Sequence, residues 1–141
     1  MGKIAFVFSG QGAQAPGMGK ELYECSAAAK AVFELCDSIR PGTSEQCFNG
    51  TKEELTVTAN TQPDMFAVEV AAARALVEAG IQPDALAGFS LGEISALAFS
   101  GAVSLEDGFK LVCRRGELMQ EASNAADSAM VAVVKRPPEK V

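Results

Sequence analysis

The chain has 141 residues, 48% of them apolar, which suits one domain, or part of one, with a buried core. Its 12 basic and 18 acidic residues give a net charge of −6, which argues against a general nucleic-acid-binding protein, because such proteins usually have a basic surplus. No apolar run is long enough to cross a bilayer, and the N-terminus lacks a signal-peptide pattern, so we expect no membrane partner.

The first half of the chain predicts one strand followed by helices. Residues 4–8 form a short, continuous apolar run, typical of a parallel strand that is buried on both faces. Residues 9–19 hold four glycines and a proline and predict a shaped loop. A helix is predicted at residues 20–36 and a polar connection at residues 41–50. Residues 51–54 have the spacing of a capping box and predict the start of a short helix.

The second half predicts an alternation of helices and strands. Pro63 suits a first helical position and Gly80 a helix C-terminus, so we expect one helix between them. The remaining predicted elements are a strand at residues 85–89, a helix at 91–100, a helix capped by Ser104 that runs to about residue 122, and a strand at 129–134. This alternation favours an α/β fold with a parallel sheet.

A serine lies between the second predicted strand and the helix after it, within Gly88-Phe89-Ser90-Leu91-Gly92. G-x-S-x-G in this context is typical of a nucleophile elbow, a tight turn that projects the hydroxyl group above the sheet edge. The helix N-terminus adds a positive partial charge there, and the Leu91 amide points to where an oxyanion would form. Ser90 and Glu93 also have capping-box spacing, so a simple helix cap is the alternative.

The glycine-rich loop after the first strand allows several interpretations. Gly10-x-Gly12-x-x-Ala15 fits a dinucleotide-binding fingerprint, but no second strand follows about thirty residues later, and Pro16 stands where the helix should begin. A close backbone approach to a ligand, with Gln11 supplying an amide donor, is a second interpretation. A mobile surface loop is the third.

One arginine falls on the apolar side of the helix that follows Ser104. Steps of about 100° per residue place Arg115 between Leu111 and Met119, whereas Arg114 faces water. A guanidinium that faces inward needs a partner, because an unpaired buried charge costs several kcal/mol. That partner is either a structural carboxylate or the carboxylate of a ligand.

The cysteines and the lack of histidine limit the chemistry that this chain can perform. The four cysteines form no C-x-x-C pair and suggest no metal site, so we interpret them as buried free thiols in a reducing cytoplasm. The chain contains no histidine. A Ser-His or Cys-His catalytic pair therefore cannot be completed within these 141 residues.

Five segments in collinear order carry a family resemblance. They are residues 6–14 (FVFSGQGAQ), residues 61–63 (TQP), residues 88–93 (GFSLGE), Arg115-Gly116-x-x-Met119-Gln120, and Met130. Together they resemble the malonyl-CoA:acyl-carrier-protein transacylases and the related acyltransferase domains of polyketide and fatty-acid synthases. The resemblance implies an α/β-hydrolase-like parallel sheet with flanking helices and an inserted ferredoxin-like subdomain. Residues 1–127 would be the N-terminal part of the core, and residues 128–141 the start of the subdomain.

The resemblance also implies roles for individual residues. Ser90 would be the nucleophile, Gln11 and Leu91 would supply the oxyanion-hole amides, and Arg115 would bind the malonyl carboxylate. Gln62 would lie near the site, with no role that the sequence reveals. A planar guanidinium that binds a carboxylate would also discriminate against neutral acyl groups.

The implied reaction transfers malonyl from CoA to the phosphopantetheine thiol of acyl carrier protein through a seryl ester, in cytoplasmic fatty-acid biosynthesis and without a cofactor. Family members often have a histidine where this chain has Phe89, but that histidine is not the catalytic base. They take their catalytic histidine from the second half of the protein. We therefore expect a truncated, poorly active form. The alternatives are another serine acyl enzyme, such as a thioesterase, and a non-catalytic interaction module that retains half the fold.

Overall fold

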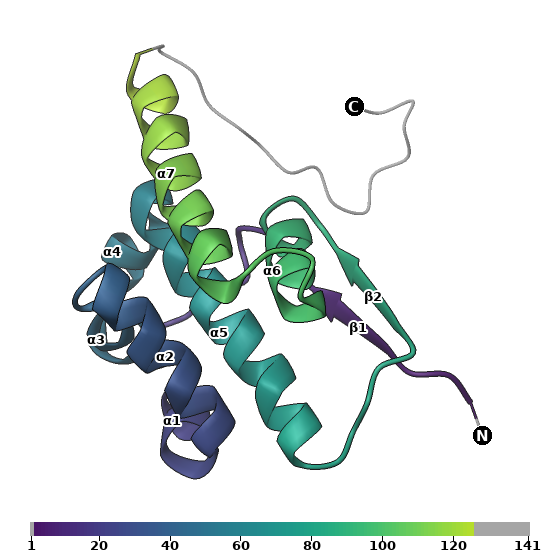
Figure 1. Ribbon diagram of the computed structural model, residues 1–141. Helices are drawn as coiled ribbons and strands as arrows, with labels where there is room; N and C mark the ends of the chain where they lie inside the picture. The colour runs from purple at the N-terminus through teal and green to yellow at the C-terminus, as the bar shows by residue number, and fades with distance from the viewer. Residues whose placement is uncertain (1, 126–141) are drawn as a thin grey trace, which may run out of the picture.

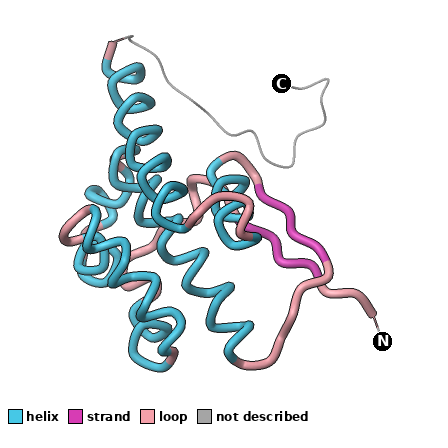
Figure 2. Tube along the Cα trace, viewed as in Figure 1, coloured by secondary structure: helices cyan, strands magenta, loops and turns pink. Residues whose placement is uncertain are grey.

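A computed structural model describes residues 2–125 of the chain. Its elements are β1 (Ala5–Phe8), α1 (Lys20–Cys25), α2 (Ala27–Ile39), α3 (Thr43–Asn49), α4 (Lys52–Thr56), α5 (Thr58–Glu78), β2 (Ala85–Gly88), α6 (Leu91–Ser100) and α7 (Leu105–Asn124). The two strands lie at one side with α6 beside them, and the other helices extend from there (Figures 1 and 2).

The two strands form a parallel pair, as the alternation of elements predicted. Ala5 is paired with Ala85 and Phe8 with Gly88. Phe6 and Phe8 are buried, but Val7 is 76% exposed. The prediction that β1 is buried on both faces was therefore wrong. Within residues 2–125 the helices cover only the face that carries the phenylalanines, so the strand alternates between buried and exposed side chains.

The longest helix, α5, joins the two hydrophobic clusters of the described residues. Phe66 packs in the larger cluster with Phe33 of α2 and Phe109 of α7, and all three side chains are fully buried. Ala73, two turns later, packs in a smaller cluster with Phe6 and Phe8 of β1. Burying each large apolar side chain contributes about 1.5–3 kcal/mol. This helix therefore fixes the sheet relative to α2 and α7.

Two predictions for the first half of the chain were wrong. The helix predicted at residues 20–36 is interrupted at Ser26, which is extended (φ −124°, ψ 120°) and separates α1 from α2. The Ser26 hydroxyl accepts the Ala29 N–H and donates to Glu78 of α5, so a local cap and a tertiary contact both stabilise the break. The polar connection predicted at residues 41–50 contains α3.

The start of α5 also differs from the prediction, because the helix begins at Thr58 and Pro63 lies inside it. The side chain of Gln120 in α7 accepts the Thr58 N–H at 2.9 Å and so caps the helix from outside. A Cβ on Gly116 would lie 3.1 Å from both the Thr58 carbonyl oxygen and the Gln62 Cβ, so glycine permits this close approach. The extra turn brings Gln62 next to α7.

Three predictions that rest on local capping signals were confirmed. Thr51 and Glu54 form both bonds of a capping box at α4. Helix α6 spans the predicted residues and ends at Gly101, and Ser104 caps α7. None of the described helices combines the length and apolarity that a membrane crossing requires. The strand predicted at residues 129–134 and the subdomain predicted to start at residue 128 lie outside the described residues.

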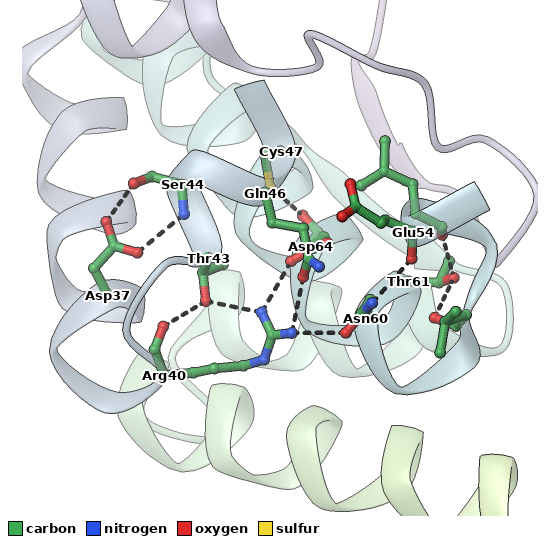
Figure 3. Close-up of polar contacts among 12 residues, drawn as sticks. Asp37, Arg40, Thr43, Ser44, Gln46, Cys47, Glu54, Asn60, Thr61 and Asp64 are labelled. Atoms are coloured by element: carbon green, nitrogen blue, oxygen red, sulfur yellow. Dashed lines mark hydrogen bonds and ion pairs between the residues drawn. The ribbon is translucent and has the colours of Figure 1, made fainter. Parts of the chain in front are cut away.

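A buried ion pair joins α2, α3 and α5 on the side of the molecule shown in Figure 3. Arg40 lies 3.3 Å from Asp64, whose side chain is fully buried, and it also donates to Thr43, Gln46 and Asn60. Within the described residues the second carboxylate oxygen of Asp64 is buried without a hydrogen-bond partner. Burial raises the pKa of Asp64 to about 7, although Arg40 lowers it.

Replacing Arg40 with alanine should destabilise the fold in a pH-dependent manner. Removing one partner of a buried ion pair costs up to about 3–5 kcal/mol, but Asp64 can take up a proton, so we expect about 2 kcal/mol at pH 8. The folded-state pKa of Asp64 exceeds its unfolded value, so the native state binds more protons between about pH 4 and 7. The cost of Arg40→Ala should therefore be small at pH 5 and grow as the pH rises.

Urea unfolding of both proteins at pH 5 and pH 8 measures this effect. In an Asp64→Ala background the pH dependence of the Arg40→Ala cost should disappear. An equal cost at both pH values in the parent background would contradict the assignment to Asp64.

Candidate active site

Ser90 lies in a strained turn between β2 and α6. Its backbone has φ 54° and ψ −106°, and it is the only residue other than glycine with a positive φ in the described part of the chain. Such a conformation costs about 1–3 kcal/mol and is found mainly at functional sites. The side chain is exposed and makes no capping hydrogen bond, so the interpretation of Ser90 as a simple helix cap was wrong.

The two glycines of the motif allow the turn to fold tightly against β1. A Cβ on Gly88 would lie 2.2 Å from the carbonyl oxygen of Gly92. A Cβ on Gly92 would lie 2.3 Å from the carbonyl oxygen of Phe8. Neither site can hold a side chain, and the resulting contacts place Ser90 at the carboxyl end of the two strands.

Arg115 lies beside the serine. Its Nη2 donates to the Ser90 Oγ at 3.0 Å and its Nη1 donates to the Gln62 Oε1 at 2.5 Å. In residues 2–125 no carboxylate lies within 4.0 Å of the Arg115 guanidinium. The structural carboxylate that was one alternative for this arginine is therefore not found among the described residues.

Gln62 acquires a role that the sequence did not reveal. Its side chain is fully buried, accepts from Arg115, and donates to the Gln11 Oε1 at 3.2 Å. The Gln11 Nε2 in turn donates to the Thr58 hydroxyl at 3.3 Å. Gln62 thus orients the guanidinium and ties it to the glycine-rich loop. No local motif predicts this role, because the first turn of α5 is stabilised by distant contacts, among them the bond from the Thr58 N–H to Gln120 of α7.

The glycine-rich loop packs against the serine turn. A Cβ on Gly10 would lie 2.7 Å from the Phe89 ring, and Gly12 has φ 116° while its N–H donates to Gln14. The backbone N–H groups of Gln11 and Leu91 donate no hydrogen bond within residues 2–125, and Leu91 is the first residue of α6. Neither amide therefore has a hydrogen-bond partner among the described residues, and Leu91 is fully buried.

The interpretation of this loop as a dinucleotide fingerprint was wrong. A dinucleotide fingerprint requires a helix directly after the loop and a nearby second strand. Instead α1 begins only at Lys20, and five helices separate β1 from β2. Two hydrogen bonds connect the loop to neighbouring helices, from the Gly17 N–H to the Cys47 carbonyl and from the Gln11 side chain to Thr58 of α5. The mobile surface loop stays a prediction.

The buried side of α7 is narrower than predicted. Phe109, Val112 and Gly116 are buried, but Leu111 and Met119 are 52% and 39% exposed. Arg115 therefore lies at the edge of the buried stripe and is only partly covered, which lets it reach Ser90. Its neighbour Arg114 faces solvent, as predicted, and pairs with Glu117 at 2.9 Å.

The cysteines are free thiols, as predicted, and three of them are poor nucleophiles. Burial raises the pKa of the Cys36 and Cys47 thiols, and it raises that of Cys113 to about 11. These thiols are therefore protonated at neutral pH. Cys25 is exposed, contrary to the prediction that the thiols are buried.

Comparison with known proteins gives a consistent family. Residues 5–140 match the family described as the acyl transferase domain. The malonyl CoA-acyl carrier protein transacylase of Bacillus subtilis strain 168 is 47% identical over 135 residues, covering 95% of this chain and 43% of that protein. The crystal structure of the transacylase of the same name from Clostridium perfringens superimposes with a TM-score of 0.80 at 43% identity, covering 86% of this chain and 39% of that one.

A second solved structure contains a partner. It is a malonyl-transacylase in complex with its type II PKS acyl-carrier protein, and it superimposes with a TM-score of 0.79 at 36% identity. That match covers 86% of this chain and 40% of the solved one. The chain thus spans less than half the length of each of these relatives.

Proposed function

Because this chain belongs to the acyl transferase domain family, we propose that it carries the nucleophile and the acyl-binding groups of a malonyl-CoA:acyl-carrier-protein transacylase. The observation that carries the proposal is the 3.0 Å contact between the Arg115 guanidinium and the Ser90 hydroxyl. A strained, exposed serine beside an arginine that has no acidic partner in residues 2–125 suits a substrate that supplies both a carbonyl and a carboxylate.

Acylation of Ser90 would proceed through a tetrahedral oxyanion. The Ser90 Oγ attacks the thioester carbonyl of malonyl-CoA, and the amides of Gln11 and Leu91 donate to the oxyanion that forms. Collapse of this intermediate breaks the carbon–sulfur bond and releases CoA thiol. The phosphopantetheine thiol of acyl carrier protein then attacks the seryl ester and leaves with the malonyl group.

Arg115 would bind the malonyl carboxylate. That carboxylate is separated from the reacting carbonyl carbon by a single methylene group, so its binding group must lie close to the nucleophile. Arg115 meets this requirement, and Gln62 holds one side of the guanidinium while the other faces Ser90. An acetyl group would leave the charge unpaired, so this arrangement favours a dicarboxylic acyl group over a neutral one and argues against a thioesterase.

The proton of Ser90 needs an acceptor from outside this chain, since the 141 residues contain no histidine. We propose that the base, like the remainder of the site, corresponds to the part of the relatives that this chain does not span. The proposal places the reaction in the cytoplasm, within fatty-acid or polyketide synthesis.

Incubation with malonyl-CoA and excess imidazole should therefore form one malonyl ester on the chain. Imidazole supplies the missing base, so we expect the initial rate to fall at least about tenfold when it is omitted, since general bases contribute roughly 10²–10⁴-fold. Intact-mass spectrometry measures the adduct. Transfer onward to acyl carrier protein should be negligible without imidazole.

Ser90→Ala is the control for this experiment, because imidazole also carries acyl groups to lysines without an enzyme. An adduct of equal yield in Ser90→Ala, or no adduct with imidazole present, would contradict the proposed function.

A further inference from the structure

The carboxylate of Glu69 connects the glycine-rich loop to α6, the two segments that carry the Gln11 and Leu91 amides. The Glu69 Oε1 accepts from the Ser9 hydroxyl at 2.7 Å, and its Oε2 accepts from the Ser95 hydroxyl at 2.6 Å. Glu69 is partly buried in α5 and forms no ion pair within the described residues. Burial raises its pKa, while the hydrogen bonds from Ser95 and Ser9 lower it.

The two serines lie at informative positions. Ser9 follows β1 directly and precedes Gln11 by two residues, at the start of the glycine-rich loop. Ser95 lies one helical turn after Leu91 in α6 and is fully buried. Each hydroxyl is therefore attached to the segment that carries one of the two backbone amides without a hydrogen-bond partner in residues 2–125.

The spacing along α5 strengthens this connection. Gln62 and Glu69 are seven residues apart, which places them on the same face of the helix, roughly 10 Å apart along its axis. Gln62 contacts the side chains of Gln11 and Arg115. Glu69 contacts Ser9 at the start of the glycine-rich loop and Ser95 in α6. One face of α5 therefore contacts the glycine-rich loop, α6 and α7.

We propose that Glu69 is a positioning residue that sets the distance between the Gln11 and Leu91 amides by bridging Ser9 and Ser95. This inference rests on the proposed function, since it assigns the two amides to one oxyanion. A partly buried carboxylate without a cationic partner in residues 2–125 is costly unless hydrogen bonds satisfy it. Here two hydroxyls satisfy it, and both belong to the segments that must be held together.

Three substitutions distinguish the effect of the Glu69 hydrogen bonds from the effect of a side chain that only fills the space. Glu69→Ala removes both hydrogen bonds. Glu69→Gln keeps the bridge, because an amide can accept from one hydroxyl and donate to the other. Ser9→Ala removes the bond on the loop side alone. Ser100→Ala is the matched control, because its hydroxyl lies on α6 but bonds only to nearby backbone.

The first readout is the position of the two amides and needs no reaction. In ¹H–¹⁵N spectra of the 141-residue chain, Glu69→Ala should shift both the Gln11 and the Leu91 resonances and speed their hydrogen exchange. Ser9→Ala should shift chiefly Gln11, whereas Glu69→Gln and Ser100→Ala should leave both close to the parent positions.

The second readout is reactivity toward an alkyl fluorophosphonate in imidazole buffer. The Ser90 Oγ–phosphorus bond forms, the phosphorus–fluorine bond breaks, and the proton leaves with imidazole. The labelling rate should fall at least about tenfold in Glu69→Ala and stay within about threefold of the parent in Glu69→Gln, since one misplaced oxyanion donor costs on the order of 10²–10³ when lost entirely.

The labelling of Ser90 tests the proposed function, and the amide resonances test the role of Glu69 independently. A parent chain that does not label at Ser90 would refute the proposed function, while the amide shifts would still decide the role of Glu69. Unmoved Gln11 and Leu91 resonances in Glu69→Ala would overturn the positioning role. Equal labelling loss in Glu69→Ala and Glu69→Gln, matched by equal loss of melting temperature, would also overturn it in favour of a purely structural role.

Discussion

Replacing Gly92 with alanine should destabilise the chain by more than about 4 kcal/mol, or prevent it from folding. The added Cβ would lie 2.3 Å from the Phe8 carbonyl oxygen and 2.5 Å from that of Ser9. Both atoms belong to backbone that β1 and the following loop fix in place, so no side-chain rotation relieves the overlap. Urea unfolding of the purified variant measures the loss.

Gly101→Ala is the matched control for this substitution. Gly101 ends the same helix with φ 82°, but a Cβ there would meet nothing within 4 Å. Its left-handed backbone should cost only about 1–2 kcal/mol. If both substitutions lower the free energy of unfolding by the same amount, steric contact at the serine turn does not explain why residue 92 is glycine.

Replacing Arg115 with alanine should lower the rate of Ser90 acylation by malonyl-CoA by a factor of about 30 to 1000. This range corresponds to about 2–4 kcal/mol for the loss of a charge-assisted pair. Acylation by acetyl-CoA should fall less, or rise, because the charge that penalises a neutral acyl group is gone. The ratio of the two initial rates, measured with imidazole present, separates this effect from the direct contact between Arg115 and Ser90.

Arg114→Ala tests whether the effect belongs to the site or to the helix. Arg114 is adjacent, exposed and paired only with Glu117, and a surface ion pair is worth about 0–1 kcal/mol. The malonyl-to-acetyl ratio should therefore stay unchanged in this variant. If Arg115→Ala lowers both rates by one factor while the fold stays intact, Arg115 does not select the malonyl group.

Much of the site could be predicted because its signals are local. The tight turn at Ser90 follows from glycines two residues away on either side, and the structure places their backbones in contact with their neighbours. The bounds of α6 follow from Gly101, and the start of α7 follows from Ser104. Helical periodicity correctly separated Arg115 from Arg114, although the two are adjacent.

The features that could not be predicted depend on contacts between distant segments. The first turn of α5 is capped by Gln120, which lies 62 residues from Thr58, and Gln62 follows this turn and contacts the guanidinium. Ser26 breaks the first predicted helix, stabilised in part by Glu78. The exposure of Val7 reflects which face of the sheet the helices cover, which strand periodicity alone does not specify.

Glu69 belongs to the same class of features. In the sequence it is one acidic residue in an otherwise apolar stretch of a helix, without a motif around it. Its partners Ser9 and Ser95 are 60 and 26 residues away. Only their shared contact reveals that one side chain spans both halves of the candidate oxyanion site.

Locating the adduct tests most directly whether Ser90 accepts the malonyl group. After incubation with malonyl-CoA and imidazole, tandem mass spectrometry of the digested chain should place the malonyl group on Ser90. The bond should survive neutral hydroxylamine under conditions that cleave thioesters, which distinguishes it from acylation of the exposed Cys25. A malonyl group found on Cys25 or on lysines, with Ser90 unmodified, would contradict the claim.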